Sequence, residues 1–133
     1  MHATINGERT LTELDHVRLS RLPGDQWPPA LADLLATAEV LHPRDMPVNV
    51  ITMYSQVELV DLHTQRRQML TVCYPDDARP GTGFISVFSP VGCSLLGLKV
   101  GAVARWQTPS GEEGTAGVMA IHFQPEASGD YLT

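Results

Sequence analysis

The chain has 133 residues, which is enough for one ordinary domain or for one small domain with an appendage. Hydrophobic residues make up 43% of the sequence and charged residues 18%, a composition that excludes a disordered chain. Nine basic and fifteen acidic residues give a net charge of −6 with no basic stripe, which argues against direct nucleic-acid binding and against docking on an anionic membrane.

Two segments upstream of residue 43 are predicted to form helices. Thr10 and Glu13 form a capping box that predicts the start of the first helix, and the Pro23-Gly24 pair ends it. The second helix is expected to begin at the Pro28-Pro29 pair and to end before Pro43. The short link between them predicts an antiparallel hairpin over residues 1–43. Apolar residues at helical spacing give each helix a face that must pack on its neighbour or on the rest of the chain.

Downstream of residue 43 the hydrophobic period changes from 3.6 to 2, which indicates strands. Residues 48–62 and 66–74 predict an antiparallel pair around a turn at 63–65, and residues 75–83 read as a loop. Further strands are expected at 84–88, 102–107 and 115–123. Ser89 followed by Pro90 predicts a short helix, with Gly97 at its left-handed C-terminal position. The whole is an α+β fold: a helical hairpin, then a five-stranded, mainly antiparallel sheet with one short helix packed on it.

The search for catalytic and metal-binding motifs is negative. The sequence contains no nucleophile elbow, phosphate-binding loop or dinucleotide fingerprint, and its five histidines lie at no metal-ligand spacing. Asp76-Asp77 reads as a solvated turn, and Cys73 and Cys93 as small buried hydrophobes. No run of about 18 apolar residues and no signal-peptide core is present, so we expect a cytoplasmic protein without metal, cofactor or membrane contact. These residues by themselves indicate a binding or regulatory module.

Three segments, residues 50–57, 86–101 and 123–132, carry a resemblance to a known family. They include Ser89-Pro90 followed by Leu95-Leu96-Gly97, and a terminal block that begins Gln124-Pro125-Glu126. Together they resemble the Rnk family, the regulators of nucleoside diphosphate kinase, which belongs with the Gre transcript cleavage factors. The likeness covers residues 44–133. It implies a C-terminal domain with an FKBP-like fold at 44–133, and it makes the hairpin at 1–43 a truncated counterpart of the Gre coiled coil.

The resemblance also implies a partner and a limit on activity. In Gre factors the coiled coil enters the secondary channel of RNA polymerase, and acidic residues at its tip hold the magnesium ion that drives RNA cleavage. The corresponding tip here, residues 22–27, has one carboxylate, Asp25, on a much shorter arm. We therefore expect a non-catalytic regulator that binds RNA polymerase near the secondary channel, competes there with Gre factors and influences nucleoside diphosphate kinase levels.

The segment that leads into the short helix touches the polymerase in Gre factors, which makes the corresponding residues here the predicted contact site: Phe88, Ser89, Pro90, Val91 and Gly92. An acidic residue often precedes this Ser-Pro in cleavage factors, whereas this chain has Phe88. A purely structural interpretation stays open, because Ser-Pro is a favourable helix start that needs no partner.

Two other functions are weighed against polymerase docking. A general interaction module would bind its partner through the helical hairpin. A peptidyl-prolyl isomerase is suggested by the FKBP-like fold, but fold does not imply function and such a site needs an aromatic-lined apolar pocket. Only eight aromatic residues occur, and they are scattered along the chain.

Overall fold

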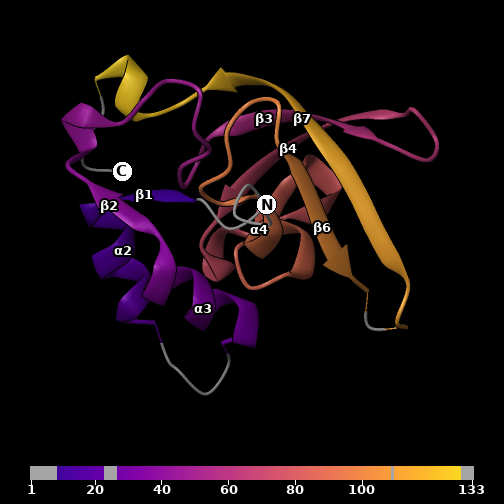
Figure 1. Ribbon diagram of the computed structural model, residues 1–133, viewed down its shortest axis with the longest axis horizontal. Coiled ribbons are helices and arrows are strands. Elements are labelled where there is room, and N and C mark those ends of the chain that lie inside the picture. Colours follow the sequence, from indigo (N-terminus) through magenta and orange to yellow (C-terminus); the bar gives the residue numbers. More distant parts are fainter. Residues whose placement is uncertain (1–8, 23–26, 109, 130–133) are drawn as a thin grey trace, which may run out of the picture.

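The computed structural model describes residues 9–22, 27–108 and 110–129. Its N-terminal part contains two short helices, α2 (Glu13–Ser20) and α3 (Pro29–Thr37), between two short strands, β1 (Thr10–Thr12) and β2 (Glu39–Leu41). The two strands pair in parallel, with Thr10 opposite Glu39. Figure 1 shows both helices on the side of the molecule away from the long hairpin of β6 and β7. The two strands are the main feature that helical periodicity failed to predict.

The predicted capping box at Thr10 is wrong, because Thr10 belongs to strand β1. The cap of α2 is Thr12, whose hydroxyl accepts the backbone N–H of Asp15 at 2.9 Å. The prediction for the second helix is confirmed at its start, where Pro29 occupies the first helical turn after the cap at Pro28. The predicted C-terminal end, just before Pro43, is wrong, because Glu39–Leu41 is strand β2 rather than helix.

The two helices are tied to each other by a hydrogen bond between His16 Nε2 in α2 and the Leu35 carbonyl oxygen in α3, at 2.9 Å. Of the predicted link between them, residues 23–27, residues 23–26 lie outside the described residues. The antiparallel arrangement of the hairpin stays a prediction.

The C-terminal part is built on a five-stranded sheet with the order β5-β4-β3-β7-β6. All neighbouring strands are antiparallel except β4 and β5, which are parallel. The predicted antiparallel pair is confirmed, but its first strand is shorter than predicted because residues 48–55 form turns around an isolated bridge. The strands are β3 (Gln56–Asp61), β4 (Arg67–Cys73), β5 (Phe84–Ser86), β6 (Val103–Gln107) and β7 (Glu113–Phe123).

The turn between β3 and β4 forms without a glycine. Gln65 takes the left-handed conformation at φ +63°, which most residues other than glycine adopt at a cost. The Asp61 carboxylate supports this turn, since its Oδ1 atom accepts the backbone N–H groups of His63 and Thr64 at 2.8 and 3.0 Å.

Helix α4 (Pro90–Leu95) lies against the sheet and contacts β4, β5 and β6. Gly97 follows it with φ +87°, as predicted for the left-handed position after a helix. Arg9 also satisfies the end of α4, because its Nη1 atom donates to the carbonyl oxygens of Cys93 at 2.7 Å and Leu96 at 3.3 Å. The start of the described chain is thereby fastened to the C-terminal part.

One hydrophobic core extends through both parts of the molecule. Leu11, Leu19 and Leu31 are fully buried in the same cluster as the side chains of the sheet and α4. The apolar faces of the N-terminal helices therefore pack against the rest of the chain, as predicted. Both cysteines are buried and free, and burial raises the pKa of each thiol, which fits their predicted structural role.

Candidate functional site

Ser89 is the N-cap of helix α4. Its Oγ atom accepts the backbone N–H of Gly92 at 3.0 Å and donates to the Ser86 carbonyl oxygen at 2.7 Å. The next residue, Pro90, is exposed. The predicted helix start is confirmed, and both hydrogen bonds of the Ser89 hydroxyl stay within the turn.

Gly92 is required by a close approach of two backbone segments. A Cβ atom at this position would lie 2.1 Å from the Ser86 carbonyl oxygen, so no larger residue fits without moving the chain. Gly92 is buried, whereas Phe88 and Val91 are partly exposed and pack against the core. Of the five residues predicted as a contact site, Gly92 therefore holds the shape of the turn, and Val91 leads into a groove.

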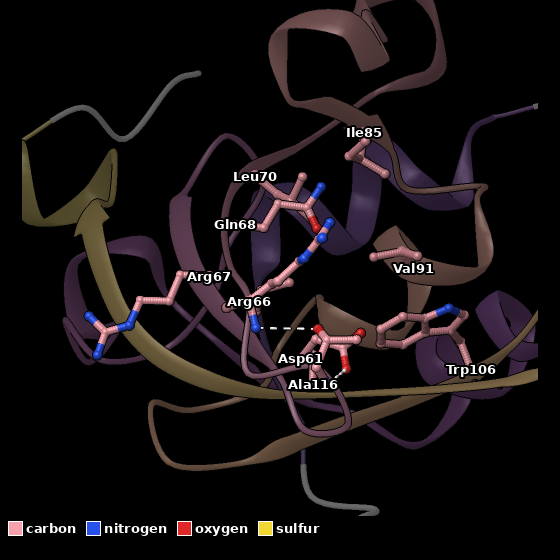
Figure 2. A pocket seen from close by; sticks show the side chains of 11 residues that line it. Asp61, Arg66, Arg67, Gln68, Leu70, Ile85, Val91, Trp106 and Ala116 are labelled. Atoms are coloured by element: carbon pink, nitrogen blue, oxygen red, sulfur yellow. Dashed lines mark hydrogen bonds between the residues drawn. The ribbon is translucent and has the colours of Figure 1, made fainter.

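This groove, about 550 Å³ in volume, opens between α4 and the sheet. Figure 2 shows Ile85, Val91 and Trp106 along one side of the view, with Leu70 and Gln68 on the other side. Polar side chains from the turn between β3 and β4 stand at its mouth. The lining comprises Leu59, Asp61, Thr64, Arg66, Arg67, Gln68, Leu70, Ile85, Val91, Trp106 and Ala116.

A glycine makes room for the aromatic wall of the groove. Trp106 in β6 is opposite Gly114 in β7, and a Cβ atom on Gly114 would lie 2.3 Å from the indole ring. The indole therefore rests on the backbone of β7. Trp106 is the one aromatic side chain among the described residues that line the groove.

The charged side chains that line the groove differ in the partners that they already have. Asp61 stabilises the β3–β4 turn. Its carboxylate accepts hydrogen bonds from the backbone N–H groups of Thr64 and His63, and these bonds lower the pKa of the carboxyl. The Arg67 guanidinium pairs with Glu58 at 3.3 Å and points away from the groove in Figure 2. Arg66 also lines the groove, and within the described part of the chain it has no ion-pair partner. The groove thus combines an apolar interior with an available guanidinium.

Sequence reasoning missed this groove, because its lining residues are separated by up to 57 positions and meet only through the strand order (59 to 116). An available signal was Trp106, a large aromatic residue in a short strand. The predicted tip residue Asp25 lies outside the described residues. Among the described residues no group of three or more His, Cys, Asp or Glu side chains is placed to hold a metal ion.

Two of the three blocks that carry the family resemblance are joined to each other inside the molecule. Gln124 Nε2 donates to the carbonyl oxygens of Pro47 and Val50, at 2.8 and 2.7 Å. Thr52 Oγ1 donates to Glu126 Oε1 at 2.7 Å. The block at 86–101 is joined to them as well, because Ile51 exchanges backbone hydrogen bonds with Leu98 and Gly97 at 2.9 and 2.8 Å, and it also supplies the turn and helix at the groove.

Comparison with known proteins identifies the C-terminal part. Residues 46–123 match the family model described as "Transcription elongation factor, GreA/GreB, C-term". The "Regulator of nucleoside diphosphate kinase" of Escherichia coli K12 is 38% identical over 103 residues, which are 77% of this chain and 76% of that protein. GreA of Nautilia profundicola is 32% identical over 61% of this chain and 50% of its own length.

Solved structures agree with this assignment. A "Prokaryotic transcription elongation factor GreA/GreB" from Nitrosomonas europaea superposes with a TM-score of 0.70 at 30% identity, over 86% of this chain and 99% of that chain. GreA factor homolog 1 of Thermus thermophilus superposes with a TM-score of 0.51 at 27% identity, over 87% of this chain and 99% of that chain. The relatives are named as regulators and transcription factors rather than as enzymes.

In the part of the chain that the structure describes, no helix is long and apolar enough to cross a membrane. All the residues that line the groove, and the whole of α4, fall within the matched range of 46–123. The chain belongs to the GreA/GreB C-terminal domain family, within which it is a relative of the regulators of nucleoside diphosphate kinase.

Proposed function

We propose that this protein is a non-catalytic transcription regulator that docks on RNA polymerase near the secondary channel and competes there with Gre factors. The observation that carries the proposal is the groove beside the Ser89-Pro90 turn, on a domain of the GreA/GreB family. Exposed Pro90, the apolar wall at Val91 and the guanidinium of Arg66 lie on or beside this groove. An apolar surface beside the Arg66 guanidinium suits a partner that presents an acidic side chain next to an aliphatic one.

The non-catalytic part of the proposal rests on the arm. Helices α2 and α3 have only eight and nine residues, so each is about 12 to 14 Å long at 1.5 Å per residue. The tip sequence between them contains a single carboxylate, Asp25. A divalent cation requires several oxygen ligands, which one carboxylate on a short arm does not supply. We therefore propose that the protein occupies a binding site on the polymerase without cleaving RNA.

The test is a direct binding titration of core RNA polymerase with the full chain. Arg66→Ala and Pro90→Ala are expected to weaken binding at least about fivefold, corresponding to roughly 1 kcal/mol per lost contact. Arg105→Ala is the matched control for Arg66→Ala, because Arg105 is exposed on β6 and does not line the groove. Phe88→Asp restores the acidic residue of cleavage factors and tests whether the turn follows their pattern.

Equal binding by wild type, Arg66→Ala and Pro90→Ala would remove the groove and the turn from the docking site. A transcript-cleavage assay on stalled complexes is the companion test, and we expect no shortening of the RNA. RNA shortening that depends on the added protein would contradict the non-catalytic part of the proposal.

We further propose that polymerase docking is the route by which this protein influences nucleoside diphosphate kinase levels, the effect for which its relatives are named. In cells that lack the gene, wild type and Arg105→Ala should restore the same kinase level, whereas Arg66→Ala should not. Full restoration by an Arg66→Ala variant that no longer binds polymerase would separate the two effects.

A further inference from the structure

A buried carboxyl group fastens helix α2 to the C-terminal part of the molecule. Asp15 is 1% exposed, and its Oδ2 atom accepts the backbone N–H of Met53 at 3.2 Å across 38 residues of sequence. Its Oδ1 atom is enclosed and has no hydrogen-bond partner among the residues that the structure describes. A carboxylate in this position loses its hydration and recovers only part of it from the protein.

The segment that receives Asp15 is a strained and closely held turn over residues 52–55. Tyr54 takes the left-handed conformation at φ +66°, a rare and costly geometry for an aromatic residue. The turn is held by the Ser55 Oγ atom, which accepts the Thr52 N–H at 2.9 Å, and by the Tyr54 N–H, which donates to the Val72 carbonyl oxygen at 2.7 Å. A turn held this firmly presents the Met53 N–H at a fixed position.

A second buried carboxyl group holds the same turn from the other side. Glu126, in the short 3₁₀ helix η5 (Glu126–Ser128), is 7% exposed and accepts the Thr52 hydroxyl at 2.7 Å through Oε1. Two carboxyl groups from distant parts of the chain therefore converge on neighbouring residues, Thr52 and Met53. Like charges in one buried site cannot both ionise freely.

We propose that Asp15 and Glu126 form a proton-dependent latch that fastens helix α2 to the 52–55 turn, and that ionisation of Asp15 loosens this attachment. Opening of the latch would release α2 locally and expose Leu19, which is now fully buried. The proposal does not depend on polymerase docking, because it concerns only contacts within this chain.

The groups that face Asp15 favour this behaviour. Burial raises the pKa of Asp15 to about 7, and the negative charge of Glu126 adds to the increase. The backbone N–H of Met53, the Thr12 hydroxyl and the positive charge of Arg18 act in the opposite direction. Tyr74, at the end of β4, also interacts electrostatically with Asp15, and its own pKa is raised, mainly by burial. The net effect is a carboxyl group that changes its charge near neutral pH.

The sign of the pH dependence follows from linkage. A carboxyl group whose pKa is higher in the closed state favours closure when it is protonated, so closure weakens as the pH rises from the open-state pKa towards the closed-state pKa. With a closed-state pKa of about 7 and the ordinary aspartate pKa of 3.8 in the open state, the closing equilibrium falls roughly thirtyfold between about pH 5.5 and pH 8. Above that range it levels off.

The test is amide hydrogen exchange of the full chain across this pH range, corrected for the intrinsic rate at each pH. Protection of the α2 amides and of the Met53 amide should fall roughly thirtyfold between about pH 5.5 and pH 8 in the wild type. Asp15→Asn should abolish this dependence. Asp33→Asn is the matched control, because Asp33 is an exposed carboxylate of α3, and it should behave as the wild type does.

Glu126→Gln keeps an oxygen that can accept the Thr52 hydroxyl but removes the second charge, so the midpoint of the wild-type transition should move to lower pH. If Asp15→Asn is unprotected at every pH because the helix has detached, this shift in Glu126→Gln decides the question. Protection of α2 that does not change with pH in the wild type, or a midpoint that Glu126→Gln leaves unchanged, overturns the proposal.

Discussion

The contribution of Ser89 to stability can be worked out from its two hydrogen bonds. Ser89→Ala removes the N-cap of α4, which costs about 1 kcal/mol of the free energy of unfolding. It also removes the bond to the Ser86 carbonyl oxygen, which costs about 0.5 to 1 kcal/mol because that oxygen still accepts the Ser89 backbone N–H. The sum is about 1.5 to 2 kcal/mol, which corresponds to a fall in Tm of roughly 5 to 7 °C for a chain of this size.

Urea unfolding followed by circular dichroism measures this change directly. Ser89→Thr is the control, since threonine keeps a hydroxyl that can make both bonds and should cost less than about 0.5 kcal/mol. An Ala variant as stable as the wild type would refute the account of the helix start. A variant with the expected loss of stability and undiminished binding to polymerase would establish that Ser89 is structural and would leave Pro90 to carry the contact.

Three further predictions concern the turn, the groove and the outer face of the sheet. Gln65→Gly should stabilise the protein by about 0.5 kcal/mol, because glycine adopts positive φ without strain, and denaturant unfolding will measure the difference. Gly114→Ala should displace the indole of Trp106 and cost about 1 to 3 kcal/mol, with a shift in tryptophan fluorescence as the groove changes shape. Glu58 accepts from His122 at 2.8 Å and pairs with Arg67, and these contacts lower the pKa of its carboxyl. The stability that ionised Glu58 contributes is present above the pKa of this carboxyl in the unfolded chain, and it is lost as the pH falls through the lower pKa of the folded protein. The wild type should therefore lose stability relative to Glu58→Gln between about pH 5 and pH 3.

Local features of this fold could be predicted from the sequence because their causes are local. The Ser89 cap, the left-handed Gly97 and the antiparallel pairing of β3 with β4 each depend on residues close together in the chain. The error at Thr10 has the opposite cause: a capping-box pattern was present, but pairing with a strand 29 positions away decided the structure (Thr10 with Glu39). Non-local pairing overrides a local signal when it satisfies more backbone groups.

The candidate site could be predicted only in part for the same reason. The turn at 88–92 could be predicted from its sequence motif. Predicting the groove requires the strand order of the sheet, which hydrophobic periodicity does not specify. The burial of Asp15 could not be predicted either, because an acidic residue in the first turn of a helix is normally exposed to solvent. This burial depends on the 52–55 turn, and the sequence pattern predicted a strand over residues 48–62 instead of a turn.

The most direct measurement is the displacement of a fluorescently labelled Gre factor from core RNA polymerase by this protein. Wild type and Arg105→Ala should displace the label at the same concentration, and Arg66→Ala should require at least about five times more, in keeping with the loss of roughly 1 kcal/mol of binding energy. Failure of the wild type to displace the label at saturating concentration, or equal displacement by Arg66→Ala, would contradict a shared docking site at the groove.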